Sequence, residues 1–316
     1  MSHDSVKRYF RRIATKRIFL HRNITLVISG ERSQNHFKSS SVHTIQLFLI
    51  SEVYRISELF MNYSTKGLDK KKNSIDVSRS ILSFLLIMTT LAGRVSLIVF
   101  VVFLFGGSLN LVQFEFTERA TLAWNALLSV TFFVQHSGMI RRSFRSRFSK
   151  IIPTLYYGIL YTIVSGIVLT MVMVFWQSSR ISLYELQDLS LWLVRGLFFL
   201  AMAGSVWVVY TLQSSELFGV ASIKAQLSGK PVRPPEFIVR GPYLWVRHPL
   251  YFFVIAMIWS CPDLAADRLL FNVLWTMWIY LGTFLEERDL LADFGEAYRE
   301  YQSRVPRLIP WKILKP

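Results

Sequence analysis

The sequence predicts an all-α integral membrane protein with about six transmembrane helices, of which the last two form a tight hairpin, followed by a cytoplasmic C-terminal helix. Two observations carry this prediction. Of the 316 residues, 52% are hydrophobic and only 18% are charged, which is too apolar for a soluble domain of this length. From residue 81 onward the apolar residues form stretches near the ~20 residues that cross a bilayer core, separated by polar loops.

The first 80 residues differ, because they hold 15 Lys and Arg against 6 Asp and Glu. We therefore divide the chain into a basic N-terminal extension, 1–80, and a helical membrane domain, 81–316. Within the extension, 43–63 has apolar residues at helical spacing, which is typical of an amphipathic helix lying on a membrane. A disordered extension and a start assigned too far upstream fit equally well. No cleavable signal peptide is expected, since no clean apolar segment with a small-residue cleavage site follows the basic start.

Four spans are predicted before the hairpin, at about 95–113, 120–139, 153–176 and 191–213. The first begins after Arg94, because a lone arginine at mid-bilayer is costly. The loop 141–150 carries five basic residues and no acid. By the positive-inside rule this loop, the loop 214–248 and both termini lie in the cytoplasm. Because the basic residues flank apolar segments, the formal charge of +16 points to membrane lipids as partners and not to nucleic acid.

The predicted hairpin consists of 249–262 and 268–285, joined by a turn. Its first arm of 14 residues spans roughly 21 Å. An antiparallel hairpin brings its start, "VRHP" (246–249), and its end, "LEERDL" (285–290), to the same membrane face. Pro249 suits the first turn of a helix, where its missing N–H is no loss. An arginine, a histidine and two carboxylates are therefore expected together at the cytoplasmic interface.

Such a set of side chains has two interpretations. Interfacial anchoring is one, since Arg side chains snorkel and Tyr gathers at headgroup level. A binding site is the other, because a carboxylate pairs with an ammonium, a guanidinium pairs with a carboxylate, and aromatic rings stack on a base or lie beside a sulfonium. Those are the groups of S-adenosylmethionine, a cytoplasmic cofactor.

Four short motifs follow one another in order: "RHPLY" (247–251), "EERDL" (286–290), "FGEAYREY" (294–301) and "VPRLIP" (305–310). This order resembles the C-terminal signature of the isoprenylcysteine carboxyl methyltransferase superfamily, and within it is most similar to bacterial methanethiol S-methyltransferases. "FFVQHSGMIRRSF" (132–144) and "ELFGVASIKAQLSGKPVRPPEF" (216–237) resemble matching segments of that group. The resemblance implies S-adenosylmethionine-dependent methylation of a small thiol, methanethiol to dimethyl sulfide, in a bacterial inner membrane. No metal site is expected.

The resemblance also implies which residues line the cofactor pocket. These are Arg247, His248, Pro249 and Tyr251 on one side, Glu286 and Glu287 on the other, and Tyr298, Tyr301 and Arg307 where the C-terminal segment closes the site. Charge matching gives the hypothesis that Glu287 binds the methionine ammonium and Arg247 the carboxylate.

His136, near the end of the second predicted span, is the candidate catalytic base. An ionisable residue inside a membrane is a functional hypothesis by default, and an imidazole is suited to take the proton of a thiol. The structural alternative is a histidine bonded to Gln135 or to the backbone within the helix bundle.

The sequence departs from the family pattern at two places. Phe253 stands where the family usually has a glycine, whose bare backbone lets a ligand approach. In the loop after the fourth span the chain has Glu216 and "FGVASIK", where the bacterial group tends to show an Asp and an Arg around "FGLRQ". That loop is a candidate lining of the acceptor site, so the acceptor is less well defined than the methyl donor. A lipid-like acceptor, the carboxylate of a prenylated cysteine, stays open.

A competing hypothesis uses the same histidines. "QHS" and "RHP" also resemble motifs in nitric-oxide-response membrane proteins and plastid ζ-carotene isomerases, some of which carry haem. His136 and His248 would then be two axial ligands on facing helices. The pair Glu286 and Glu287 and the tail with two tyrosines favour the methyltransferase, because a bis-histidine haem site has no obvious use for them. A non-enzymatic relative is the third alternative.

Overall fold

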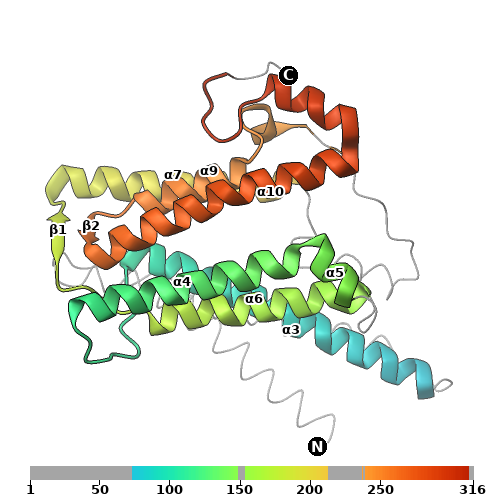
Figure 1. Ribbon diagram of the computed structural model, residues 1–316, viewed down its shortest axis with the longest axis horizontal. Helices are drawn as coiled ribbons and strands as arrows, with labels where there is room; N and C mark the ends of the chain where they lie inside the picture. The colour runs from blue at the N-terminus through green and yellow to red at the C-terminus, as the bar shows by residue number, and fades with distance from the viewer. Residues whose placement is uncertain (1–72, 149–153, 213–236, 238, 313–316) are drawn as a thin grey trace, which may run out of the picture. The chain divides into compact units, whose positions relative to one another are not determined.

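The computed structural model describes residues 73–148, 154–212, 237 and 239–312 (Figure 1), all within one compact unit, Lys71–Pro316. The predicted amphipathic segment 43–63 and the departures at Glu216 and "FGVASIK" lie outside the described residues. The division into an extension and a membrane domain at residue 80 therefore stays a prediction.

Seven α-helices make up most of the described chain: α3 (Asn73–Gly106), α4 (Glu118–Ile140), α5 (Arg142–Phe148), α6 (Thr154–Phe175), α7 (Asp188–Leu212), α9 (Pro249–Trp259) and α10 (Ala266–Arg304). A short 3-10 helix, η1 (Gly241–Leu244), precedes α9. The strands β1 (Ser182–Glu185) and β2 (Asp263–Ala265) form a two-stranded antiparallel sheet. α3 packs on α6, α7 packs on α9, and α4 packs on both α6 and α10 (Figure 1).

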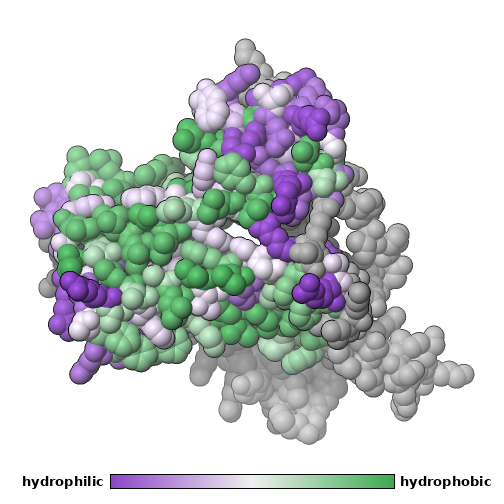
Figure 2. Space-filling view, in the orientation of Figure 1, coloured by the Kyte–Doolittle hydropathy of each residue, from purple (hydrophilic) through white to green (hydrophobic). Residues whose placement is uncertain are grey.

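Four helical segments of the described chain are long and apolar enough to cross a membrane: Ser83–Gly106, Tyr156–Phe175, Asp188–Thr211 and Ala266–Arg304. Large apolar side chains such as Leu193 and Leu200 are exposed on them. Figure 2 shows such side chains over most of the visible face, with polar ones gathered around the end of α10. The prediction of a helical integral membrane protein is confirmed. The count of six spans and the hairpin are not confirmed, since α4 is not among these segments and α9 has only 11 residues.

The first predicted span has different bounds in the structure. α3 runs without a break past Arg94, which has an interaction partner, and ends at Gly106 instead of residue 113. Gly107 explains the end of the helix, because its φ of 82° is a left-handed conformation that glycine adopts without strain, and its N–H donates to the Phe103 carbonyl at 2.8 Å. The apolar run continues to Val112 and conceals this stop signal in the sequence.

α10 joins the predicted arm 268–285 to the predicted C-terminal helix. Gly295, with φ 57° and ψ −127°, is the point where the helical geometry breaks. From Ala266 to Glu286 the helix rises roughly 30 Å, which matches the ~30 Å core of a bilayer. The carboxylates of Glu286 and Glu287 thus lie one bilayer thickness from the start of the helix.

Phe253, the residue in place of the family glycine, faces α7. A Cβ built on Gly204 of α7 would lie 2.3 Å from the Cε1 atom of Phe253, so the two helices approach closely at this pair. Phe253 is packed against the main hydrophobic core. Within the described residues it lines neither of the two cavities described below. The departure from the family pattern therefore affects helix packing.

Replacing Gly204 with alanine is expected to destabilise the α7–α9 contact by about 1–3 kcal/mol, the usual cost of overpacking a filled core. Thermal unfolding in detergent measures the effect. Gly196→Ala is the matched control, because Gly196 lies on the same helix and a Cβ built on it has no neighbouring atom within 4 Å. Equal melting temperatures for the two variants would show that the helices accommodate the added methyl group.

Candidate functional site

The buried carboxylate of Glu287 on α10 is the centre of a charged cluster. Its Oε1 accepts from Arg247 Nε at 2.7 Å and its Oε2 accepts from Arg307 Nη2 at 2.9 Å. Gln302 Nε2 donates to Oε2 at 3.0 Å, and His248 Nε2 lies 3.2 Å from Oε1. With four side chains around it and only 4% of its surface exposed, this carboxylate is fully engaged inside the protein.

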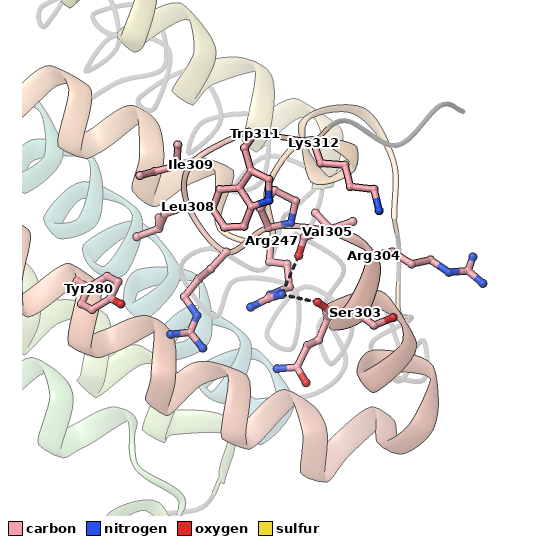
Figure 3. A pocket seen from close by; sticks show the side chains of 12 residues that line it. Arg247, Tyr280, Ser303, Arg304, Val305, Leu308, Ile309, Trp311 and Lys312 are labelled. Carbon is pink, nitrogen blue, oxygen red and sulfur yellow. Dashed lines mark hydrogen bonds between the residues drawn. The ribbon is translucent and has the colours of Figure 1, made fainter.

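The same cluster holds the C-terminal segment against the start of α9. The backbone N–H groups of Arg247 and His248 donate to the carbonyls of Pro306 and Arg307 at 2.9 and 3.1 Å. The Arg247 guanidinium also donates to the Val305 carbonyl at 2.7 Å (Figure 3). The "RHPLY" and "VPRLIP" motifs, about 50 residues apart in sequence, are thus joined by backbone and side-chain hydrogen bonds.

His248 lies between the two adjacent carboxylates. Its Nε2 faces Glu287, its Nδ1 lies 3.5 Å from Glu286 Oε2, and its ring stacks on Tyr251 with centroids 5.4 Å apart. Burial lowers the pKa of His248, whereas the hydrogen bonds and charges of Glu286 and Glu287 raise it, and the net pKa lies above the usual value. Its contribution to stability is therefore complete below the unfolded-state pKa and is lost as the pH rises through the raised folded-state pKa.

Two cavities lie on different faces of α10. Tyr280 lines the first and Gly282 the second, and at about 100° per residue these positions are roughly 160° apart around the helix. We call the first the basic cavity and the second the histidine cavity.

The basic cavity has a volume of about 530 Å³ (Figure 3). Four basic residues line it, and the described lining includes no acidic residue; the four are Arg247, Arg304, Arg307 and Lys312. Trp311 and Tyr280 supply apolar surface. This lining suits an anion and is unfavourable for a sulfonium cation.

The histidine cavity has a volume of about 260 Å³ and the opposite character. Three aromatic rings line it, those of His136, Tyr251 and Trp278, together with three carboxylates, those of Glu286, Asp289 and Asp293. Aromatic faces and carboxylates stabilise a cation. The only arginine among the described lining residues is Arg141, at the end of α4.

The structure divides the predicted site residues into groups. Arg247, His248, Glu287 and Arg307 meet in the charged cluster, whereas His136, Tyr251 and Glu286 meet at the histidine cavity. Pro249 is the first residue of α9, as its position before the apolar run predicted.

Tyr298 and Tyr301 belong to a separate aromatic cluster with Phe237. The Tyr301 hydroxyl donates to the Tyr243 carbonyl at 2.7 Å, and the buried Tyr298 hydroxyl has no hydrogen-bond partner among the described residues. Neither tyrosine lines either cavity within the described part of the chain.

The structure adds residues that the sequence reasoning missed. Tyr161 of α6 lies with its hydroxyl 3.0 Å from His136 Nε2, so this tyrosine, and not Gln135, is the polar partner of the histidine. Trp278 lines the histidine cavity, and Gln302 donates to Glu287. Nothing in the sequence distinguishes Tyr161 or Trp278 from other aromatic residues of apolar helices.

The haem hypothesis fits the structure poorly. Both ring nitrogens of His248 face carboxylates, and 5% of the residue is exposed. An iron atom would have to displace one of these contacts to be bound by His248.

Comparisons with known proteins agree with the motifs. The chain is 35% identical to methanethiol S-methyltransferase 1 of Bradyrhizobium diazoefficiens over 60% of its own length and 66% of that protein, just under two thirds. It is 34% identical to the methanethiol S-methyltransferase of a Pseudomonas species (strain GM41) over 59% of its length and 72% of that protein. It is 32% identical to the methanethiol S-methyltransferase of Pseudomonas deceptionensis over 59% of its length and 71% of that protein. No family model and no solved structure matches.

Fold and site together define a helical integral membrane protein with a charged cluster and a histidine-lined cavity at one end of its last long helix. Its motifs and the relatives that are at least 30% identical agree on the group within that class. The chain belongs to the methanethiol S-methyltransferase family.

Proposed function

We propose that this protein transfers a methyl group from S-adenosylmethionine to methanethiol, which yields dimethyl sulfide. The histidine cavity is the observation that carries the proposal. It joins groups that stabilise a cation, Glu286 and Tyr251, with an imidazole, His136, that can take a proton. The names of the relatives supply the acceptor.

The residues at the histidine cavity fit the ammonium and the sulfonium of S-adenosylmethionine, and Arg141 is the cation in the described lining for the carboxylate beside the ammonium. Glu286 is the available carboxylate of the adjacent pair, since 45% of its side chain is exposed and it lines the cavity. Binding of the ammonium to Glu287 would require the ligand to displace the donors already there. We therefore assign the binding of the ammonium to Glu286. Arg247, Glu287 and Arg307 instead hold His248 and the C-terminal segment in position.

Methyl transfer from a sulfonium is an in-line displacement, and the bound cofactor supplies the activated methyl group. The protein's part is to align a thiol with that methyl group and to exclude water, which supplies much of the rate. Tyr251 and Trp278 bound the cavity with aromatic surface, and His136 accepts the proton of the thiol.

The relatives favour a small acceptor. Methanethiol is proposed over a prenylated cysteine, the alternative within the same class, because relatives that are 34% and 32% identical carry the name methanethiol S-methyltransferase.

The proposed location is a bacterial inner membrane, with the site and both termini on the cytoplasmic side. The Arg-rich helix α5 follows α4 directly, and Arg141 between them lines the histidine cavity, so the basic loop and the site share one end of the bundle. The positive-inside rule places that end in the cytoplasm, where S-adenosylmethionine is made and where anionic lipids are the expected partners of the basic residues.

Glu286→Gln is expected to weaken donor binding by roughly 10-fold to 100-fold, the worth of about 1.5–3 kcal/mol for a hydrogen bond to a charged group. The stability of the fold should fall only slightly, because the side chain is half-exposed and its contact with His248 is a long one of 3.5 Å. The assay uses the purified full chain in detergent with S-adenosylmethionine and methanethiol, and follows dimethyl sulfide in the headspace beside a donor-binding titration.

Glu296→Gln is the matched control, since Glu296 lies on the same helix with 81% of its side chain exposed and pairs only with Arg299 in the described structure. Absence of dimethyl sulfide from a wild type that binds the donor would overturn methanethiol as the acceptor. Absence of donor binding would overturn the methyltransferase. Wild-type affinity in Glu286→Gln would overturn only the assignment of the ammonium.

A further inference from the structure

A chain of polar side chains connects α4 and α6 beside the histidine cavity. The Tyr161 hydroxyl lies 3.0 Å from His136 Nε2 and 3.3 Å from Nδ1, and it also bonds to Ser165. Gln135 Nε2 donates to Ser165 Oγ at 3.1 Å. Buried polar side chains are costly unless they are hydrogen-bonded, so a network of four of them between two helices is a candidate for a functional role.

We propose that Tyr161 is a positioning residue, which fixes the tautomer and the orientation of His136 so that one unprotonated ring nitrogen faces the thiol. This inference rests on the proposed function and deepens it. In the proposed arrangement one ring N–H of His136 donates to the Tyr161 oxygen. The Tyr161 O–H in turn donates to Ser165 Oγ and not to the histidine, so the ring nitrogen without a hydrogen keeps its lone pair for the thiol proton.

Aromatic neighbours hold the plane of the His136 ring. The Tyr161 hydroxyl then has to fix only how the ring is turned within that plane. The His136 ring centroid lies 5.1 Å from that of Phe132 and 5.5 Å from that of Trp278. Trp278 is itself held, because its Nε1 donates to Ser137 Oγ at 3.0 Å. The orientation of a catalytic histidine by a hydrogen-bonded neighbour is what keeps it in the tautomer that serves as a base.

The reaction balances with these groups. The thiol proton moves to the free nitrogen of His136, and the sulfur electron pair forms a bond to the methyl carbon. The bond from that carbon to the donor sulfonium breaks, and its electron pair returns to the donor sulfur. The imidazolium of His136 then releases its proton to water.

Other titratable groups face the same cavity and will also shape its pH response. In the described structure they are Tyr251 of α9, Arg141 after α4, and Glu286, Asp289 and Asp293 of α10. None of them is changed by substitution of Tyr161, so a comparison of variants isolates the effect of the hydroxyl.

Tyr161→Phe is expected to lower kcat at neutral pH by on the order of 10-fold, a part of the ~10²–10⁴ that a general base contributes. Donor affinity should be unchanged. The defect should shrink as the pH rises, because a thiol that ionises in solution needs no base. In a His136→Gln background the tyrosine substitution should cost nothing more, since it acts only through the histidine.

Tyr156→Phe is the matched control, because Tyr156 lies on the same helix and packs in a separate cluster around Ile159. A second readout does not depend on activity. Nitrogen NMR of histidine-labelled protein, with the His136 signal assigned by its loss in His136→Gln, should show one dominant tautomer in the wild type and a mixture in Tyr161→Phe.

Wild-type kcat in Tyr161→Phe, an equal defect at every pH, or an unchanged tautomer would overturn the role of Tyr161 and leave the proposed function intact. A wild type that forms no dimethyl sulfide would overturn the proposed function, and this inference with it.

Discussion

Replacing Glu287 with alanine is expected to lower the free energy of unfolding by about 3–5 kcal/mol, because it leaves two arginines without their shared carboxylate. Arg247 is 10% exposed and Arg307 25% exposed, so water replaces the lost charge only in part. His248 loses a hydrogen bond at the same time. The C-terminal segment should detach from the start of α9, and donor binding and activity should be lost with it.

Thermal unfolding and limited proteolysis in detergent check this expectation. Glu287→Gln should fall between the wild type and Glu287→Ala, since the amide keeps an acceptor for one guanidinium while the charge is gone. Glu296→Ala serves as the surface control, because exposed ion pairs contribute about 0–1 kcal/mol. If Glu287→Ala melts at the temperature of Glu296→Ala, the cluster does not hold the C-terminal segment in place.

The sequence predicted this cluster for a physical reason. "RHPLY" starts a helix, so Arg247 and His248 had to lie at its end, and Glu287 follows Ala266 by about one bilayer thickness. Residues at the ends of membrane helices are placed by length alone. Helix length thus indicated that Arg247, His248 and Glu287 lie at one level, whereas Arg307 was expected there only from the family resemblance.

The division of labour between Glu286 and Glu287 was not predictable. Adjacent residues on a helix point about 100° apart, so one carboxylate lies in the charged cluster and the other lines the histidine cavity. Which carboxylate faces which side depends on the rotation of α10 against α4 and α9. That rotation is set by packing contacts such as Trp275 on Phe132, which no motif encodes.

The bounds of α3 and the partner of His136 were missed for similar reasons. An apolar run in the sequence does not show where the helical backbone ends. Gly107 ends α3 inside such a run. Tyr161 is separated from His136 by 25 residues, and only the packing of α4 on α6 brings the two together.

Replacing His136 with glutamine is expected to lower kcat at neutral pH by about 10²–10⁴, the usual contribution of a positioned base. Glutamine can still form hydrogen bonds, but it cannot take the proton of the thiol. The variant should then depend on the fraction of thiol that ionises in solution, which rises tenfold with each pH unit below the pKa of the thiol. Rates of dimethyl sulfide formation across a pH series measure this slope.

The acidity of the acceptor gives the sharper comparison. An aromatic thiol ionises at much lower pH than an alkyl thiol, so a base adds little to the methylation of an aromatic thiol. The ratio of the wild-type rate to the His136→Gln rate should therefore be far smaller for an aromatic thiol than for methanethiol. A structural role for His136 would instead lower the rate for both thiols by the same factor at every pH. Because the histidine cavity also holds Glu286, donor affinity must be measured for the variant, and it should match the wild type if His136 acts on the acceptor alone.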